Sequence, residues 1–121
     1  MNSTIDELNL AGKDDVLIAI TVTPYSRETI EACQFARTNG VKLVLISDSE
    51  ILAPDFSADE TLIASTLSTH HFSCYAGVIA VIETLIALLV AEGGEAARER
   101  IKSYEDLRQS SQAYWVAQKK P

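Results

Sequence analysis

Two short stretches of the sequence are rich in hydroxyl side chains. Residues 21–26 read Thr-Val-Thr-Pro-Tyr-Ser, and residues 65–69 read Ser-Thr-Leu-Ser-Thr. A hydroxyl group both donates and accepts hydrogen bonds, so several of them in one turn can surround an oxyanion. Each stretch lies between an apolar segment typical of a strand and a segment typical of a helix. Because the first turn of a helix offers free N–H groups and the positive end of the dipole, such a place suits a phosphate.

Two further residues belong to or adjoin the first hydroxyl-rich stretch. Tyr25 lies inside it and Arg27 directly follows it. Arg27 could hold an anion through its guanidinium group, or it could lie in solvent on a helix face. Helix capping and turn formation also explain hydroxyls at such a position. We favour binding because several hydroxyls converge on one helix start. The predicted ligand-binding residues are Thr21, Thr23, Tyr25, Ser26, Arg27, Thr29 and Ser68.

Three residues could act as acids or bases. His70 and His71 directly follow the second hydroxyl-rich stretch, and Glu83 is the only charged residue between positions 61 and 91. Adjacent histidines point in different directions, and no third ligand has suitable spacing, so no metal site is predicted. Glu83 lies in the middle of an expected helix, where a structural hydrogen bond or an intersubunit contact is favoured over catalysis. The sequence calls for no cofactor.

These residues are positioned by an alternation of strands and helices. Val16–Ile20 is a continuous apolar run, which is typical of a strand buried on both faces of a parallel sheet. A strand–helix–strand unit of about thirty residues indicates parallel strands with a right-handed crossover. Ligands of such sheets bind at the carboxyl ends of the strands. The predicted strands span residues 15–22, 41–47 and 60–65, and the predicted helices span 26–38, 72–91 and 95–115, with a short helix or turn at 3–11 and a break at 92–94.

The composition is that of one soluble domain spanning residues 1–121. The chain has a net charge of −7 and no cluster of Lys and Arg, so direct contact with nucleic acid is not expected. Cys33 and Cys74 lie far apart, which favours reduced thiols in a cytoplasmic protein. The start of the sequence is not typical of a signal peptide. The most apolar stretch, residues 75–91, contains Glu83, so a membrane span is not predicted.

Three segments together resemble the sugar isomerase (SIS) domain family. The stretch T-V-T-P-Y-S-R-E-T, at residues 21–29, resembles the S-x-S-G-x-T-x-E-T phosphate loop of that family, and is most similar to the variants in RpiR-type transcriptional regulators. Gly40-Val41-Lys42 and Ile46-Ser47-Asp48-Ser49 are similar to the next strand of the family. The segment A-V-I-E-T-L-I-A-L-L resembles its long helix. The resemblance covers about residues 14–114.

The resemblance implies a three-layer α-β-α sandwich with a parallel sheet. It also implies that the hydroxyls of Thr21, Thr23 and Ser26 hold a phosphate, helped by backbone N–H groups out to Thr29. Pro24 stands where Gly is common and removes one N–H donor. Nothing in the sequence matches the first strand of the family, its G-x-G-x-S turn or the regulators' helix-turn-helix domain. We therefore expect an N-terminally incomplete domain.

The favoured hypothesis is the effector-sensing and dimerisation domain of an RpiR-type regulator that binds a phosphorylated sugar or sugar acid. The alternative is a sugar-phosphate isomerase or related lyase that uses Glu83, His70 or His71 for proton transfer. A scaffold that binds no ligand is a third possibility. A homodimer or higher homo-oligomer is expected, because the apolar helix has more hydrophobic surface than one small sheet can cover.

Overall fold

The computed structural model describes residues 3–50 and 55–111. The chain forms two compact units, residues 1–82 and 83–121. The first unit contains the sheet, two short helices and the start of a long helix. The second contains the rest of that helix.

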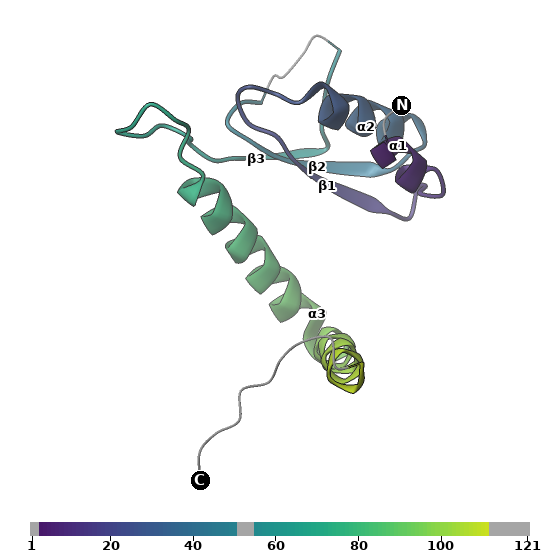
Figure 1. Cartoon of the computed structure of the whole chain (residues 1–121). Coiled ribbons are helices and arrows are strands. Elements are labelled where there is room, and N and C mark those ends of the chain that lie inside the picture. The colour runs from purple at the N-terminus through teal and green to yellow at the C-terminus, as the bar shows by residue number, and fades with distance from the viewer. Residues whose placement is uncertain (1–2, 51–54, 112–121) are drawn as a thin grey trace. The chain divides into compact units, whose positions relative to one another are not determined.

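The sheet of the first unit has three parallel strands (Figure 1). They are β1 (Val16–Ile20), β2 (Lys42–Ser47) and β3 (Glu60–Ile63), with β2 in the middle. Val16 is in register with Lys42, and Val44 is in register with Glu60. The apolar runs therefore form strands where they were predicted. β1 and β2 each start one residue later than predicted, and β1 and β3 each end two residues earlier.

Two helices lie before and after β1 in the chain: α1 (Ser3–Leu8) and α2 (Arg27–Thr38). Ser26 is the N-cap of α2, and its side-chain oxygen accepts a hydrogen bond from the Thr29 N–H at 3.4 Å. The helix ends at Thr38 with Asn39 as its C-cap, and Gly40 follows with a φ of 81°, a left-handed conformation that glycine adopts without strain. Both ends of α2 confirm the prediction from the sequence.

The core of the first unit lies between α2 and one face of the sheet. Leu43 and Leu45 of β2 are fully buried, and they pack with Ala19 of β1 and Cys33 of α2. Burial raises the pKa of the Cys33 thiol, so this cysteine serves as a small apolar core residue. The middle strand and the buried side of α2 thus hold the turns at the strand ends in place.

The opposite face of β1 corrects one expectation. Val16, Ile18 and Ile20 are 57%, 45% and 47% exposed, so β1 is buried on one face and not on both. The reason is that β1 is an edge strand of this sheet and that alternate side chains point to opposite faces. Ala19, on the face that packs against α2, is buried.

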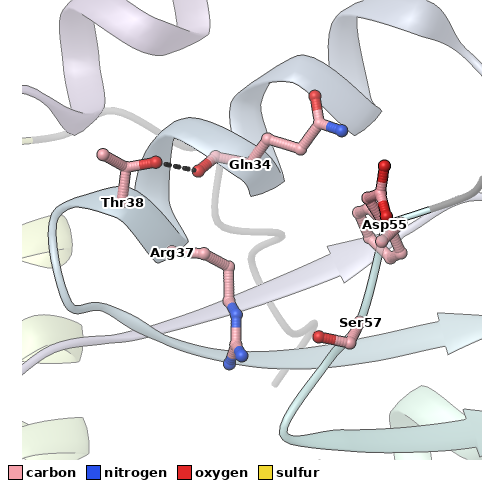
Figure 2. Close-up of a pocket in the computed structure, with 6 residues that line it drawn as sticks. Gln34, Arg37, Thr38, Asp55 and Ser57 are labelled. Carbon is pink, nitrogen blue, oxygen red and sulfur yellow. Dashed lines mark hydrogen bonds between the residues drawn. The ribbon is translucent and has the colours of Figure 1, made fainter.

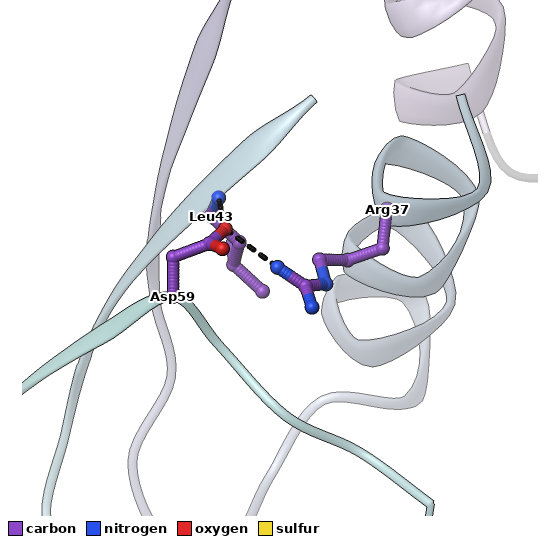
Figure 3. Close-up of polar contacts among 3 residues, drawn as sticks. All are labelled: Arg37, Leu43 and Asp59. Atoms are coloured by element: carbon purple, nitrogen blue, oxygen red, sulfur yellow. Dashed lines mark hydrogen bonds and ion pairs between the residues drawn. The ribbon is translucent and has the colours of Figure 1, made fainter. Parts of the chain in front are cut away.

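A polar contact joins the end of α2 to the start of β3 (Figure 3). Asp59 accepts hydrogen bonds from the Leu43 N–H at 2.7 Å and from the Arg37 guanidinium at 2.5 Å, while its own N–H donates to the Leu43 carbonyl at 2.9 Å. The Leu43 N–H bond and then the Arg37 bond lower the pKa of the Asp59 carboxyl. This contact continues the β2–β3 pairing through a side chain.

Helix α3 (Ala76–Ser110) begins four residues later than predicted and is interrupted at Gly94. Gly94 has φ 57° and ψ −138°, so two helical segments meet there in a kink, as Gly93-Gly94 indicates from the sequence. The spacing of Ile101, Tyr104 and Leu107 among charged residues predicts that they face inward, but all three are exposed. Trp115, assigned to the same face, lies outside the described residues.

The apolar part of α3 is long enough to cross a membrane by length and composition, with a mean hydropathy of 2.0 and only 6% of the window buried. The apolar helix of a soluble protein passes the same test. Glu83 lies within this part, and a carboxylate is costly in hydrocarbon. The side chains of Ile86, Leu88 and Leu89 are each at least half exposed.

Candidate functional site

The carboxyl ends of the three strands lie at one edge of the sheet, and the two hydroxyl-rich stretches follow two of these ends. The Thr21 N–H donates to the Ile46 carbonyl at 3.1 Å, and the Ala64 N–H donates to the Ser47 carbonyl at 2.8 Å. The turns after β1 and β3 therefore flank the end of β2. This is the arrangement that the parallel topology predicts.

Asp48, directly after β2, connects the two turns. Its Oδ1 accepts a hydrogen bond from the Tyr25 hydroxyl at 2.8 Å. Its Oδ2 accepts from the Thr23 N–H at 3.3 Å and from the Thr66 hydroxyl at 3.4 Å. The Ser47 hydroxyl lies 3.4 Å from Oδ1. One carboxylate thus uses donors from the turn after β1 and from the turn after β3.

Asp48 was not among the predicted site residues. Its signal in the sequence is a carboxylate placed directly after the middle strand, at the edge where ligands of parallel sheets bind. Partial burial acts to raise the pKa of the Asp48 carboxyl, but hydrogen bonds from Tyr25 and Thr23 outweigh it and hold the pKa below the ordinary 3.8. Asp48 therefore carries a negative charge at neutral pH.

Besides Tyr25, the turn at residues 21–26 has three hydroxyl residues, which lie in different surroundings. Thr21 is buried, with only 6% of its surface exposed, while Thr23 and Ser26 are exposed. The Thr23–Pro24 peptide is cis. Ser26 caps α2, so its hydroxyl oxygen lies beside the first-turn N–H groups of a twelve-residue helix. These surroundings provide hydroxyls and a helix N-terminus in one place, which suits an oxyanion.

Arg27 and Thr29 occupy the first turn of α2. Arg27 is exposed. The Thr29 N–H is used by the Ser26 cap. Thr29 also lines a hollow of about 200 Å³ between α1, β1 and α2, together with residues such as Thr4 and Cys33. The structure therefore brings Thr23 and Tyr25 together with the turn after β3, and places the Thr29 residue beside a separate hollow.

The turn after β3 is held by its own hydrogen bonds. The Ser68 hydroxyl lies 2.5 Å from the Phe72 carbonyl and 2.8 Å from the His70 carbonyl. The Phe72 N–H donates to the His70 Nδ1 at 3.1 Å. His71 is exposed in the same turn.

The remaining acid–base candidate is remote from these turns in the chain. Glu83 is exposed on α3 and belongs to the second unit. Within residues 3–50 and 55–111, no group of three His, Cys, Asp or Glu side chains is placed to hold a metal ion.

A second hollow, of about 220 Å³, lies at the other end of α2 (Figure 2). In Figure 2, the Arg37 side chain extends from the end of α2 toward the segment that carries Ser57, and the Thr38 hydroxyl donates back to the Gln34 carbonyl. The C-terminal end of a helix dipole disfavours anions, and Arg37 is already paired with Asp59. This hollow was not predicted, and its chemistry does not match that of a phosphate site. Its lining residues are Gln34, Arg37, Thr38, Asp55, Phe56 and Ser57.

Comparison with known proteins identifies the family. The sequence model of the SIS domain matches residues 2–91, which is most of the chain. The chain belongs to the SIS domain family. No curated protein matches it. The match includes β1, β2, β3 and the apolar part of α3, so the α/β fold with a parallel sheet predicted from the sequence is confirmed.

A solved structure specifies the SIS relationship further. The chain is similar to the crystal structure described as the RpiR transcription factor from Sphaerobacter thermophilus (sugar isomerase domain), with a TM-score of 0.76 and 26% sequence identity. The similarity covers 88% of this chain and 59% of that chain. The predicted resemblance to the SIS domain of an RpiR-type regulator is therefore confirmed. This SIS chain spans about three fifths of the length of that relative.

Proposed function

We propose that this SIS domain binds a phosphorylated sugar or sugar acid at the turn formed by residues 21–26. The observation that carries the proposal is the meeting of two hydroxyl-rich turns at the carboxyl end of β2, beside the N-terminus of α2. The phosphate would lie at the first turn of α2, where Ser26 and the helix dipole favour negative charge. The sugar hydroxyls would face the turns that Asp48 connects.

The domain acts in our proposal as an effector sensor of an RpiR-type transcriptional regulator, and not as an enzyme. The similarity to the sugar isomerase domain of an RpiR transcription factor supports this choice. The surroundings of the acid–base candidates also support a sensor. The His70 Nδ1 is in contact with the Phe72 N–H, and Glu83 is exposed on α3. An isomerase needs an acid and a base within reach of the sugar carbonyl carbon and its neighbour.

The exposed apolar side of α3 supports a homodimer or higher homo-oligomer, and the similarity to a transcription factor domain supports a soluble, cytoplasmic protein. Ile79, Ile86, Leu88 and Leu89 are each at least half exposed. Contiguous apolar surface of this kind is covered in soluble proteins by a partner. A ligand that binds one arrangement of two protomers more tightly than another would shift their equilibrium, which is how a sensor without turnover responds.

The experiment is a binding and turnover screen with hexose and pentose phosphates and their unphosphorylated sugars. Sensing predicts a higher melting temperature with a sugar phosphate, no conversion to product, and no response in the Thr23→Ala/Ser26→Ala variant. A ligand at one hundred times its Kd stabilises the fold by about 2.7 kcal/mol, which is easily detected. Turnover that is lost in His70→Ala or Glu83→Gln would replace sensing by isomerase activity. The absence of any shift would favour a scaffold that binds no ligand.

A further inference from the structure

We propose that the Asp48 carboxylate is an internal competitor of the ligand phosphate, and so determines how strongly and how selectively this site binds anions. The inference rests on the proposed sugar-phosphate site and adds a residue that tunes it.

Asp48 accepts hydrogen bonds from three donors in the two turns. Its two oxygens accept from the Thr23 N–H, the Tyr25 hydroxyl and the Thr66 hydroxyl. Backbone N–H and hydroxyl groups at a strand–helix turn are the donors that a bound phosphate takes. A backbone N–H makes one good hydrogen bond, so a phosphate oxygen on the Thr23 N–H must displace the carboxylate from it.

The two carboxylate oxygens of Asp48 differ in the lengths of their hydrogen bonds. The contact of Oδ1 with the Tyr25 hydroxyl is short, at 2.8 Å, while the contacts of Oδ2 with Thr23 and Thr66 are 3.3 and 3.4 Å. Hydrogen bonds weaken as they lengthen beyond the usual range. An incoming anion can therefore displace Oδ2 from both of its donors while Tyr25 still holds Oδ1.

The charge of Asp48 also opposes the binding of an anion. Asp48 is ionised at neutral pH, because its hydrogen-bond donors hold its pKa below the ordinary value. Arg27, the basic residue that directly follows the turn at residues 21–26, is exposed. A fixed negative charge a few ångströms from a phosphate, partly in solvent, weakens binding by about fivefold, and salt screens the effect. The consequence is a site that responds only when the ligand is abundant and that prefers a ligand with hydroxyls able to donate to the carboxylate.

The test compares the whole chain with its Asp48→Asn variant, using glucose 6-phosphate and inorganic phosphate as probes and glucose as the uncharged control. Asn keeps an acceptor for the Tyr25 hydroxyl but removes the charge. The proposal predicts phosphate binding about fivefold tighter in Asp48→Asn by calorimetry at low salt, with the gain shrinking as salt is raised. The matched control is Asp14→Asn, which removes an exposed charge next to the opposite end of β1. This variant should bind glucose 6-phosphate and inorganic phosphate with the affinities of the original chain.

Each other result contradicts the inference. Equal or weaker binding of both phosphate probes by Asp48→Asn shows that the carboxylate does not compete, while the proposed function stands. A gain that salt does not reduce, or one that Asp14→Asn matches, shows that the effect is not local charge at the site. Binding by neither protein removes the proposed function and this inference together. If Asp48→Asn does not fold, as judged by circular dichroism, Asp48→Ser removes the same charge and carries the same prediction.

Discussion

Replacing Ser26 separates its two roles, as a helix cap and as a phosphate ligand. The hydroxyl oxygen of Ser26 accepts from the Thr29 N–H at 3.4 Å, which is a long contact. Loss of an N-cap costs about 0.5–2 kcal/mol, and the long contact places Ser26→Ala near the lower end, at about 0.5–1 kcal/mol. For a unit of this size, such a loss lowers the melting temperature by about 2–8 °C.

Ser26→Asp provides the decisive comparison. Asp is as good an N-cap as Ser, and its charge is favourable at the positive end of the α2 dipole, so this variant keeps the stability of the original chain. The same carboxylate lies where the phosphate is proposed to bind and repels it. Ser26→Asp should therefore melt like the original chain without ligand but show little or no stabilisation by sugar phosphate.

The assay is differential scanning fluorimetry with a series of sugar-phosphate concentrations, supported by chemical unfolding in urea. Ser26→Ala should lose stability and part of the ligand response. The reasoning is refuted if Ser26→Asp binds sugar phosphate as tightly as the original chain, because the phosphate would then lie elsewhere. It is also refuted if Ser26→Ala unfolds at the original temperature, since the cap would then contribute nothing.

Three further predictions concern the turns and the core. Tyr25→Phe removes the 2.8 Å bond to the Asp48 carboxylate and should cost about 1–2 kcal/mol in urea unfolding, with a rise in the Asp48 pKa measured by NMR; an unchanged Asp48 titration would contradict it. Asp59 has a folded pKa below its ordinary 3.8, so its stabilising effect is present above that value and is lost as pH falls through the lower folded pKa. The urea concentration at the unfolding midpoint should decrease as pH is lowered through that acidic range, and it should decrease less in Asp59→Asn. Equal pH dependence in both chains would show that the ionisation of Asp59 is not linked to folding. Leu43→Ala, in the fully buried core, should cost about 2–5 kcal/mol, whereas Leu67→Ala, on a side chain 91% exposed, should leave the urea midpoint unchanged.

The local structure was largely predictable because it depends on signals close together in the sequence. The apolar run before residue 21 and the Ser26 cap place the start of α2, and Gly40 places its end. Parallel pairing of β1 with β2 follows from one crossover of fixed handedness. These rules also bring the two hydroxyl-rich turns to one edge of the sheet.

The missed features depend on contacts between distant segments. Asp48 stands 23 residues from Tyr25 and 18 from Thr66, and only the pairing of both neighbours with β2 makes it the common acceptor. The exposed face of β1 depends on its position at the edge of the sheet, which an apolar run alone does not reveal. Tyr104 is exposed on an amphipathic helical segment. An amphipathic pattern indicates that one face of the helix packs against another surface, but it does not identify that surface.

The central position of β2 makes the two turns energetically dependent on each other through one side chain. Tyr25 and Thr66 follow strands that do not pair with each other, and both donate to Asp48. Combined substitutions Tyr25→Phe and Thr66→Val should therefore be non-additive in a double-mutant cycle. In an Asp48→Ala background the same two substitutions should become additive, because the carboxylate that couples the two turns is absent.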